Sequence, residues 1–202
     1  TAMTPPWLNL KKTADRLELI DILQNVQGNL TLPLRYWSQD ESRIGLKTIT
    51  RCILTALGVK PVGPMQWIFQ SFYLYGAVEP LTGDSFFLEF SHLDADCFQI
   101  FLEQFSQTHP HSLNVIQLDN GRFHFAKKLQ IPENVVLLFQ PPYSPDINPI
   151  ERVWQFIKDQ LRWLNLKNLD ELRKKIDEVI QSITPNQIAS LTSFDFILTA
   201  IK

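Results

Sequence analysis

The amino-acid sequence predicts an α/β fold in which one mixed β-sheet carries helices on both faces. Two observations lead to this prediction. Segments 66–80 and 84–90 are rich in aromatic and β-branched residues, and the turn signal at 80–83 between them favours an antiparallel hairpin. Further along, the strand-like segments 112–119 and 134–139 alternate with helical patterns, which is typical of parallel strands joined by helices.

The elements before the hairpin are a helix and a strand. Segment 13–26 has apolar residues at helical spacing, and segment 32–40 alternates apolar and polar residues as a strand does. Segment 42–66 mixes basic residues with glycine and proline, so we expect a long loop that includes a short strand at 50–57.

Helical patterns dominate the second half of the chain. Segment 94–107 has an acidic first turn and phenylalanines on one face, which predicts an amphipathic helix. A short helix is expected at 122–130, a longer one from about 149 to 164, and another amphipathic helix at 168–183. The tail from 186 onward is expected to start as a helix and to continue irregularly.

Composition places the chain among globular proteins. Apolar residues make up 45% and charged residues 20% of its 202 residues, which suits one domain with at most a small appendage. Cys52 and Cys97 are far apart and in no ligand spacing, so we expect reduced thiols in a cytosolic protein, with neither a disulfide nor a zinc site. No apolar run reaches membrane-spanning length and no signal peptide opens the chain, so no membrane partner is expected.

The charges are unevenly distributed along the chain. A net charge of −2 argues against a broadly basic nucleic-acid coat. Two stretches nevertheless hold a surplus of basic residues: 42–78 has four and no acidic residue, and 152–175 has seven against three acidic ones. Such a surplus forms either a solvated face or a surface that neutralises phosphates.

Two aspartates follow predicted strands. Asp119 comes at the carboxyl end of a central strand, where ligands bind in open α/β sheets, although Asp-Asn-Gly is also a common turn. Asp40 ends the first predicted strand on the face of Tyr36, so it lies either at an exposed strand end or in a site. Glu41 is expected to point to the opposite face. His124 either approaches the site or packs within a short helix.

The third acid, Glu151, follows a stretch with four prolines. Asn148 suits an N-cap, Pro149 the first helical position and Glu151 the third, a capping-box arrangement that needs no chemistry. On the helix that follows, Glu151 leads a polar stripe with Lys158 and Arg162 beside the apolar stripe. Either a solvated face or a carboxylate beside a polyanionic substrate explains this pattern.

In a parallel arrangement the three acids can meet at one edge of the sheet. Three convergent carboxylates repel one another unless cations lie between them, and carboxylate oxygens favour Mg²⁺ or Mn²⁺. Two such ions about 3.5–4 Å apart support in-line phosphoryl displacement. The prolines would then fix the third acid with little conformational entropy left to lose.

The segments that carry these acids are WSQDESRIG (37–45), IQLDNGRFH (116–124) and PPYSPDINPIERVW (141–154). In this order they resemble the catalytic blocks of the DDE transposases, most closely the bacterial insertion-sequence branch of the mariner superfamily, over about residues 32–164. The resemblance implies a ribonuclease H-like fold with a five-stranded mixed sheet. It also implies that Asp40, Asp119 and Glu151 are the catalytic residues and bind two divalent ions, Mg²⁺ or Mn²⁺.

The resemblance further implies a reaction and its partners. The ions would activate water to nick transposon ends, and the freed 3′-hydroxyl would attack target DNA. Expected partners are double-stranded DNA, as terminal inverted repeats and as target, and a second copy of the chain on that DNA, in the bacterial cytoplasm and at the nucleoid. The loop 42–66 resembles the segment that reaches a partner subunit or DNA in relatives. The expected DNA-binding residues are Arg43, Lys47, Arg51, Lys60, Arg152, Lys158 and Arg162.

The chain departs from the family pattern in two places. Asp119 and Glu151 are separated by 31 residues, fewer than is typical, and residues 1–28 offer one helix where relatives usually carry helix-turn-helix domains. We therefore expect an N-terminal helical segment at 1–28, a catalytic domain at 29–165 and a C-terminal helical extension at 166–202. A catalytically silent DNA-binding or interaction module, or another ribonuclease H-like nuclease, is the alternative.

Overall fold

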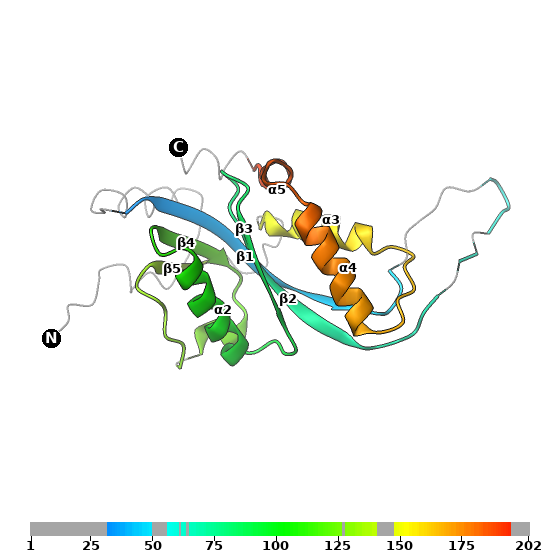
Figure 1. The fold of residues 1–202 in the computed structure, drawn as a ribbon, viewed down its shortest axis with the longest axis horizontal. Helices are drawn as coiled ribbons and strands as arrows, with labels where there is room; N and C mark the ends of the chain where they lie inside the picture. The colour runs from blue at the N-terminus through cyan, green and yellow to red at the C-terminus, as the bar shows by residue number, and fades with distance from the viewer. Residues whose placement is uncertain are drawn as a thin grey trace.

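The computed structural model describes residues 32–49, 56–60, 62–63, 65–126, 128–140 and 148–194. A five-stranded sheet lies at its centre (Figure 1). The strands are β1 (Leu34–Gly45), β2 (Ser71–Val78), β3 (Ser85–Phe90), β4 (Leu113–Leu118) and β5 (Val135–Phe139). They lie in the order β3-β2-β1-β4-β5, with β2 antiparallel to β1 and β3, and β4 parallel to β1 and β5. The mixed five-stranded sheet is therefore confirmed.

Helices cover both faces of this sheet, as the sequence predicts (Figure 1). They are α2 (Ala95–Thr108), α3 (Ile150–Gln160), α4 (Leu169–Ser182) and α5 (Pro185–Thr192), with a 3₁₀ turn, η2 (Arg122–Phe125), after β4. α2 packs its phenylalanines against one face, in a core that includes Trp37 and Tyr75. α3, α4 and α5 pack on the other face, in a second core that includes Ile44 and Phe72.

β1 lies between the two cores because its side chains alternate between the faces of the sheet. Trp37 belongs to the core under α2, while Ile44 belongs to the core under α3. Asp40 shares the parity of Ile44 and so faces α3. Glu41 has the parity of Trp37 and faces α2, in agreement with the prediction that the two neighbouring acids point apart.

β1 is longer than the sequence predicts. It continues to Gly45 because β2 pairs with it from Ser38 onward. Asp40 therefore lies within the strand, and the prediction that it ends the strand is wrong. β4, however, pairs with β1 only as far as Ser38. Asp40 is thus just beyond the parallel part of the sheet, with β2 as its neighbouring strand.

Other expectations differ from the structure or lie outside its description. The helix expected at 122–130 is only the single 3₁₀ turn η2. The helix expected at 13–26, most of the strand at 50–57 with Arg51, and the loop 141–147 are not among the described residues. In the part of the chain that is described, no helix combines the length and the hydropathy needed to cross a membrane.

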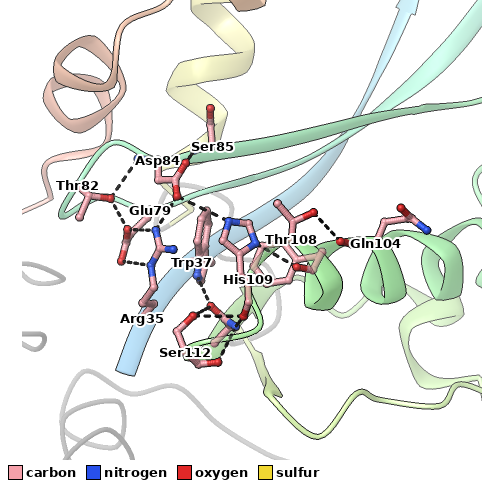
Figure 2. Close-up of polar contacts among 12 residues, drawn as sticks. Arg35, Trp37, Glu79, Thr82, Asp84, Ser85, Gln104, Thr108, His109 and Ser112 are labelled. Carbon is pink, nitrogen blue, oxygen red and sulfur yellow. Dashed lines mark hydrogen bonds and ion pairs between the residues drawn. The ribbon is translucent and has the colours of Figure 1, made fainter. Parts of the chain in front are cut away.

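A cluster of paired charges joins the start of β1 to the turn between β2 and β3 (Figure 2). Arg35 donates to both oxygens of Glu79, over 3.2 and 2.5 Å, and to Asp84 Oδ2 over 2.7 Å. Its guanidinium lies 4.5 Å from the ring centroid of Trp37, and His109 at the end of α2 lies 3.7 Å from Asp84. These contacts tie the hairpin to β1 and to α2.

Candidate active site

Asp40 is held in place by a tryptophan on the helix that covers it. Trp154 of α3 donates its indole N–H to Asp40 Oδ2 over 3.0 Å. Opposite Asp40 in β2 is Gly76, and a Cβ at that position would lie 2.6 Å from the Trp154 ring. Glycine is therefore needed there for the indole to lie against the sheet and reach the carboxylate.

The charge on Asp40 is poorly compensated. Burial, followed by the charges on Glu41 and Glu151, raises the pKa of Asp40 to about 8. The opposing contacts are hydrogen bonds from the Glu41 backbone and from Trp154, and neither donor carries a positive charge. Glu151 lies in the first turn of α3, the helix whose Trp154 donates to Asp40, so the structure brings these two acids near each other.

α3 begins beside Asp40 through a contact that the sequence does not reveal. Pro149 takes the N-cap position and no side chain caps the helix, so the capping-box interpretation of Asn148 and Glu151 is wrong. Asn148 Nδ2 instead donates over 3.0 Å to the backbone oxygen of Gln39, the residue before Asp40. This bond fixes the first turn of α3, which carries Glu151, against β1.

Asp119 lies in the turn that follows β4, and its side chain is 58% exposed. Its Oδ1 accepts the backbone N–H of Gly121 over 2.8 Å and faces His124 Nδ1 at 3.1 Å. The hydrogen bond from His124, with smaller help from the Gly121 backbone, lowers the pKa of Asp119 against the opposing effect of burial. Unlike Asp40, this carboxylate has a cationic partner within the chain.

His124 links Asp119 to β1, a role that sequence reasoning left open. Its Nε2 lies 3.2 Å from Glu41 Oε1, and its Nδ1 lies 3.2 Å from the backbone oxygen of Asp119. Both oxygens only accept hydrogen bonds, so both ring nitrogens donate and the ring is an imidazolium. Burial would lower the pKa of His124, but its bonds to Asp119 and Glu41 raise it to about 9. The sequence signal was the position of a histidine five residues after Asp119.

The donor set fits a hard divalent cation. Asp40 and Glu151 offer only carboxylate oxygens, the ligands that Mg²⁺ and Mn²⁺ prefer, and the side chain that donates to Asp40 is the neutral Trp154. Within the described residues, no three or more His, Cys, Asp and Glu side chains come close enough together to hold a metal ion. Asp40, Asp119 and Glu151 therefore do not form such a group as they stand in this structure.

Basic residues line two neighbouring pockets next to these acids. One, of about 670 Å³, is lined by Glu151 and residues of α3, and the other, of about 360 Å³, runs along the end of β1. Lys158 and Ile49 line both pockets. Lys60 lines neither, and Arg51 lies outside the described residues. The expected DNA-binding residues that the two pockets gather are Arg43, Lys47, Arg152, Lys158 and Arg162.

The sequence also matches a known protein family over most of the region just described. The model of the DDE superfamily endonuclease family matches residues 35–173. This chain belongs to that family. The matched range begins in β1, ends in α4 and includes Asp40, Asp119 and Glu151. The family assignment expected from the sequence is thereby confirmed.

Named relatives place this chain in the mariner and insertion-sequence branch. It is 33% identical over 109 residues to protein y4pE/y4sA of Sinorhizobium fredii, a match that covers 54% of this chain and 76% of that protein. It is 30% identical over 80 residues to the Tcb2 transposase of Caenorhabditis briggsae, covering 38% of this chain and 29% of that protein. It is 25% identical over 122 residues to a 39 kDa protein of insertion element IS630 from Shigella sonnei, covering 57% and 36%. The chain thus spans about a third of the last two relatives.

Solved structures of a transposase share the fold of this chain. The pre-cleavage Mos1 transpososome matches with a TM-score of 0.66 and 13% identity, covering 93% of this chain and 62% of that chain. The Mos1 transposase in a paired-end complex with the left transposon end matches with a TM-score of 0.63 and 14% identity, covering 95% and 60%. At such identities the likeness shows the fold, which is ribonuclease H-like, as expected from the sequence.

Proposed function

We propose that this chain is the catalytic part of a transposase, which uses divalent ions to cut DNA at transposon ends and to join the freed 3′-hydroxyl to target DNA. One observation carries the proposal. Partly buried Asp40 lies near Glu151 and Glu41 without a cationic partner among the described residues, just beyond the parallel strands. Uncompensated carboxylates of this kind are typical of functional sites. We assign catalysis to residues 29–165, followed by a C-terminal extension at 166–202 and preceded by a helical segment.

Asp40, Asp119 and Glu151 are the residues that would hold the ions. Mg²⁺ or Mn²⁺ bound there would activate the attacking oxygen and stabilise the leaving oxygen of the phosphodiester. The chain itself contributes positioning, because the Trp154 N–H holds Asp40 and Asn148 holds the first turn of α3. Mos1 mariner paired-end complexes with Mn and with Mg, each 15% identical to this chain, support the choice of ions.

The DNA would lie along the two basic pockets. The cations of the first pocket lie on α3 with Glu151, and the second pocket adds cations at the end of β1. Phosphate neutralisation supplies much of the affinity of proteins for DNA. Lys158 holds the central position because it lines both pockets. Lys60 and Arg51, on the segment between β1 and β2, would extend this surface toward transposon-end or target DNA.

The segment between β1 and β2 is proposed to pack on a second copy in a homodimer on DNA. Figure 1 shows its described residues 56–60 and 62–63 reaching away from the sheet. Leu57, Val62 and Phe69 are 105%, 97% and 70% exposed. These exposed apolar side chains support the proposed contact, because interaction sites often present apolar surface. A bacterial protein with these partners would act at the nucleoid.

The test of the reaction is cleavage of a plasmid that carries the ends of the chain's own element. With Mg²⁺ or Mn²⁺, the chain should nick the ends, and Asp119→Asn should abolish nicking. Asp96→Asn is the matched control, because Asp96 is an exposed acid of α2 paired with Lys128. Metal-dependent nicking that survives Asp119→Asn would refute the mechanism. DNA binding without cleavage would favour a silent module, and cleavage of an RNA–DNA hybrid without strand transfer would favour another nuclease.

The proposed DNA path is tested by the salt dependence of binding. Lys158→Gln should weaken binding to all sequences similarly and reduce the slope of log K against log salt by about 0.9, the value of one lost phosphate contact. Lys175→Gln is the control, since Lys175 lies on α4, 3.4 Å from Glu178, and lines neither pocket. Equal slopes for the two variants would remove Lys158 from the interface.

A further inference from the structure

We propose that His124 is a positioning residue that holds Asp119 by one oxygen, so that Oδ2 is the oxygen offered to a divalent cation. The proposal rests on the function proposed above, in which Asp119 binds metal. It assigns a task to a buried histidine and to Glu41, neither of which belongs to the set of three acids.

The hydrogen bonds of Asp119 are unevenly divided between its two oxygens. Oδ1 receives the Gly121 N–H at 2.8 Å and lies 3.1 Å from His124 Nδ1. Oδ2 has no hydrogen-bond partner among the described residues. A carboxylate held in this way has its rotation fixed and one oxygen left for a ligand, which is how residues next to metal ligands orient them.

The histidine ring is itself held rigidly. Its side chain is 1% exposed, and its ring centroid lies 4.5 Å from that of Phe98 and 4.1 Å from that of Phe123. Its far nitrogen, Nε2, lies 3.2 Å from Glu41 Oε1, and that oxygen also accepts the side-chain N–H of Gln39 over 2.7 Å. A fixed ring with a fixed anchor can hold Asp119 in one place.

This bridge reaches across the sheet where the strand pairing has ended. β4 pairs with β1 only up to Gln117 opposite Ser38, so Asp119 lies beyond the last paired residues. The contact from His124 to Glu41 ties the Asp119 turn back to β1, one residue from Asp40. The bridge therefore sets the position of Asp119 relative to Asp40.

A purely structural role predicts something different. If the ring only fills space beside α2, substitutions of similar effect on stability should have similar effects on metal binding. Two variants separate these roles, because an asparagine amide nitrogen occupies roughly the place of Nδ1 and a glutamine amide nitrogen that of Nε2. His124→Asn keeps a donor to Asp119 and loses the contact with Glu41. His124→Gln keeps the contact with Glu41 and loses the donor to Asp119.

The experiment measures Mn²⁺ binding to the full chain by electron paramagnetic resonance of the free ion, with thermal unfolding recorded in parallel. His124→Gln should weaken Mn²⁺ binding about 10–100-fold, the usual effect of removing a residue that orients a metal ligand. His124→Asn should bind within a few-fold of the unsubstituted chain. Equal affinities of the two variants, whether both unchanged or both weakened, would overturn the assignment.

Two further measurements keep the proposal separate from the function on which it rests. Asp40→Asn should abolish tight Mn²⁺ binding, and failure there refutes the metal site itself and not the role of His124 alone. If a histidine variant does not fold, Glu41→Ala replaces it. Loss of this anchor should weaken Mn²⁺ binding in the unsubstituted chain but not in Asp119→Asn, and an equal loss in both backgrounds would show that the bridge does not act through Asp119.

Discussion

Two groups of charges lie along β1 and differ in how they are balanced. At the start of the strand, Arg35 contacts Glu79 and Asp84, so each carboxylate has a cation within hydrogen-bonding distance (Figure 2). Further along, Asp40 lies near Glu151 with only the neutral N–H of Trp154 as its side-chain donor. The charges of the first group are balanced within the folded chain, whereas under the proposed function a bound cation would balance those of the second.

The difference separates a structural role from a functional one. A buried charge pair is costly to break, because the remaining partner is left desolvated and alone. An unpaired buried carboxylate lowers stability in the folded chain, and such groups persist chiefly where binding or catalysis needs them. We therefore expect substitutions in the two groups to have opposite consequences for stability and activity.

The largest expected effect is on cleavage. Glu151→Gln should reduce the rate at transposon ends by about 10³-fold, equivalent to about 4 kcal/mol, because the amide cannot supply the negative charge to a metal ion. Its free energy of unfolding should stay the same or rise. Glu79→Gln is the matched change in the paired group, and it should lower stability through the contact with Arg35. Loss of folding in Glu151→Gln would return this residue to a structural role.

The positions of the three acids and the buried faces of the helices and strands depend on neighbouring residues in the chain, so the sequence predicts them. The contacts that position the acids join residues far apart in the chain. The residues around Asn148 predict that it caps the helix, yet its side chain donates to the backbone oxygen of Gln39, 109 residues earlier. β4 stops pairing with β1 at Ser38, so the Gln39 backbone next to it needs another donor. The bridge from His124 to Glu41 likewise spans 83 residues, and no periodicity records it.

The next largest effect is expected in the paired group. Arg35→Met should destabilise the fold by about 3 kcal/mol, because it leaves Glu79, whose side chain is 4% exposed, without its cation. Urea unfolding measures the loss. Arg173→Met is the control, since Arg173 makes its ion pairs at the surface and its loss should cost clearly less stability. Equal losses would mean that the Arg35 cluster is no more structural than a surface pair.

At Asp40 the change in the free energy of unfolding should have the opposite sign. Asp40→Asn removes a carboxyl that must take up a proton on folding at neutral pH, because it lies partly buried near Glu41 and Glu151, so the metal-free protein should gain about 1–2 kcal/mol. The pKa of this carboxyl is raised on folding, so the unsubstituted protein loses stability as the pH rises from 3.8 to about 8, and the advantage of the variant grows over that window. Thermal unfolding in a chelator measures this difference. Added Mg²⁺ should stabilise the unsubstituted protein more than the variant.

The smallest expected effect tests whether ion pairing or burial gives the first group its structural role. Asp84 contacts Arg35 at 2.7 Å, as close as a strong ion pair, but its side chain is 46% exposed. Asp84→Asn leaves the bond from Arg35 to Glu79 in place, and water can replace the lost charge, so we expect a loss of less than about 1 kcal/mol in urea unfolding. A loss as large as that of Arg35→Met would show that pairing alone makes such a group structural. A small loss assigns that role to the burial of Glu79, which leaves its charge with no source of compensation among the described residues other than Arg35 and its hydrogen-bond donors.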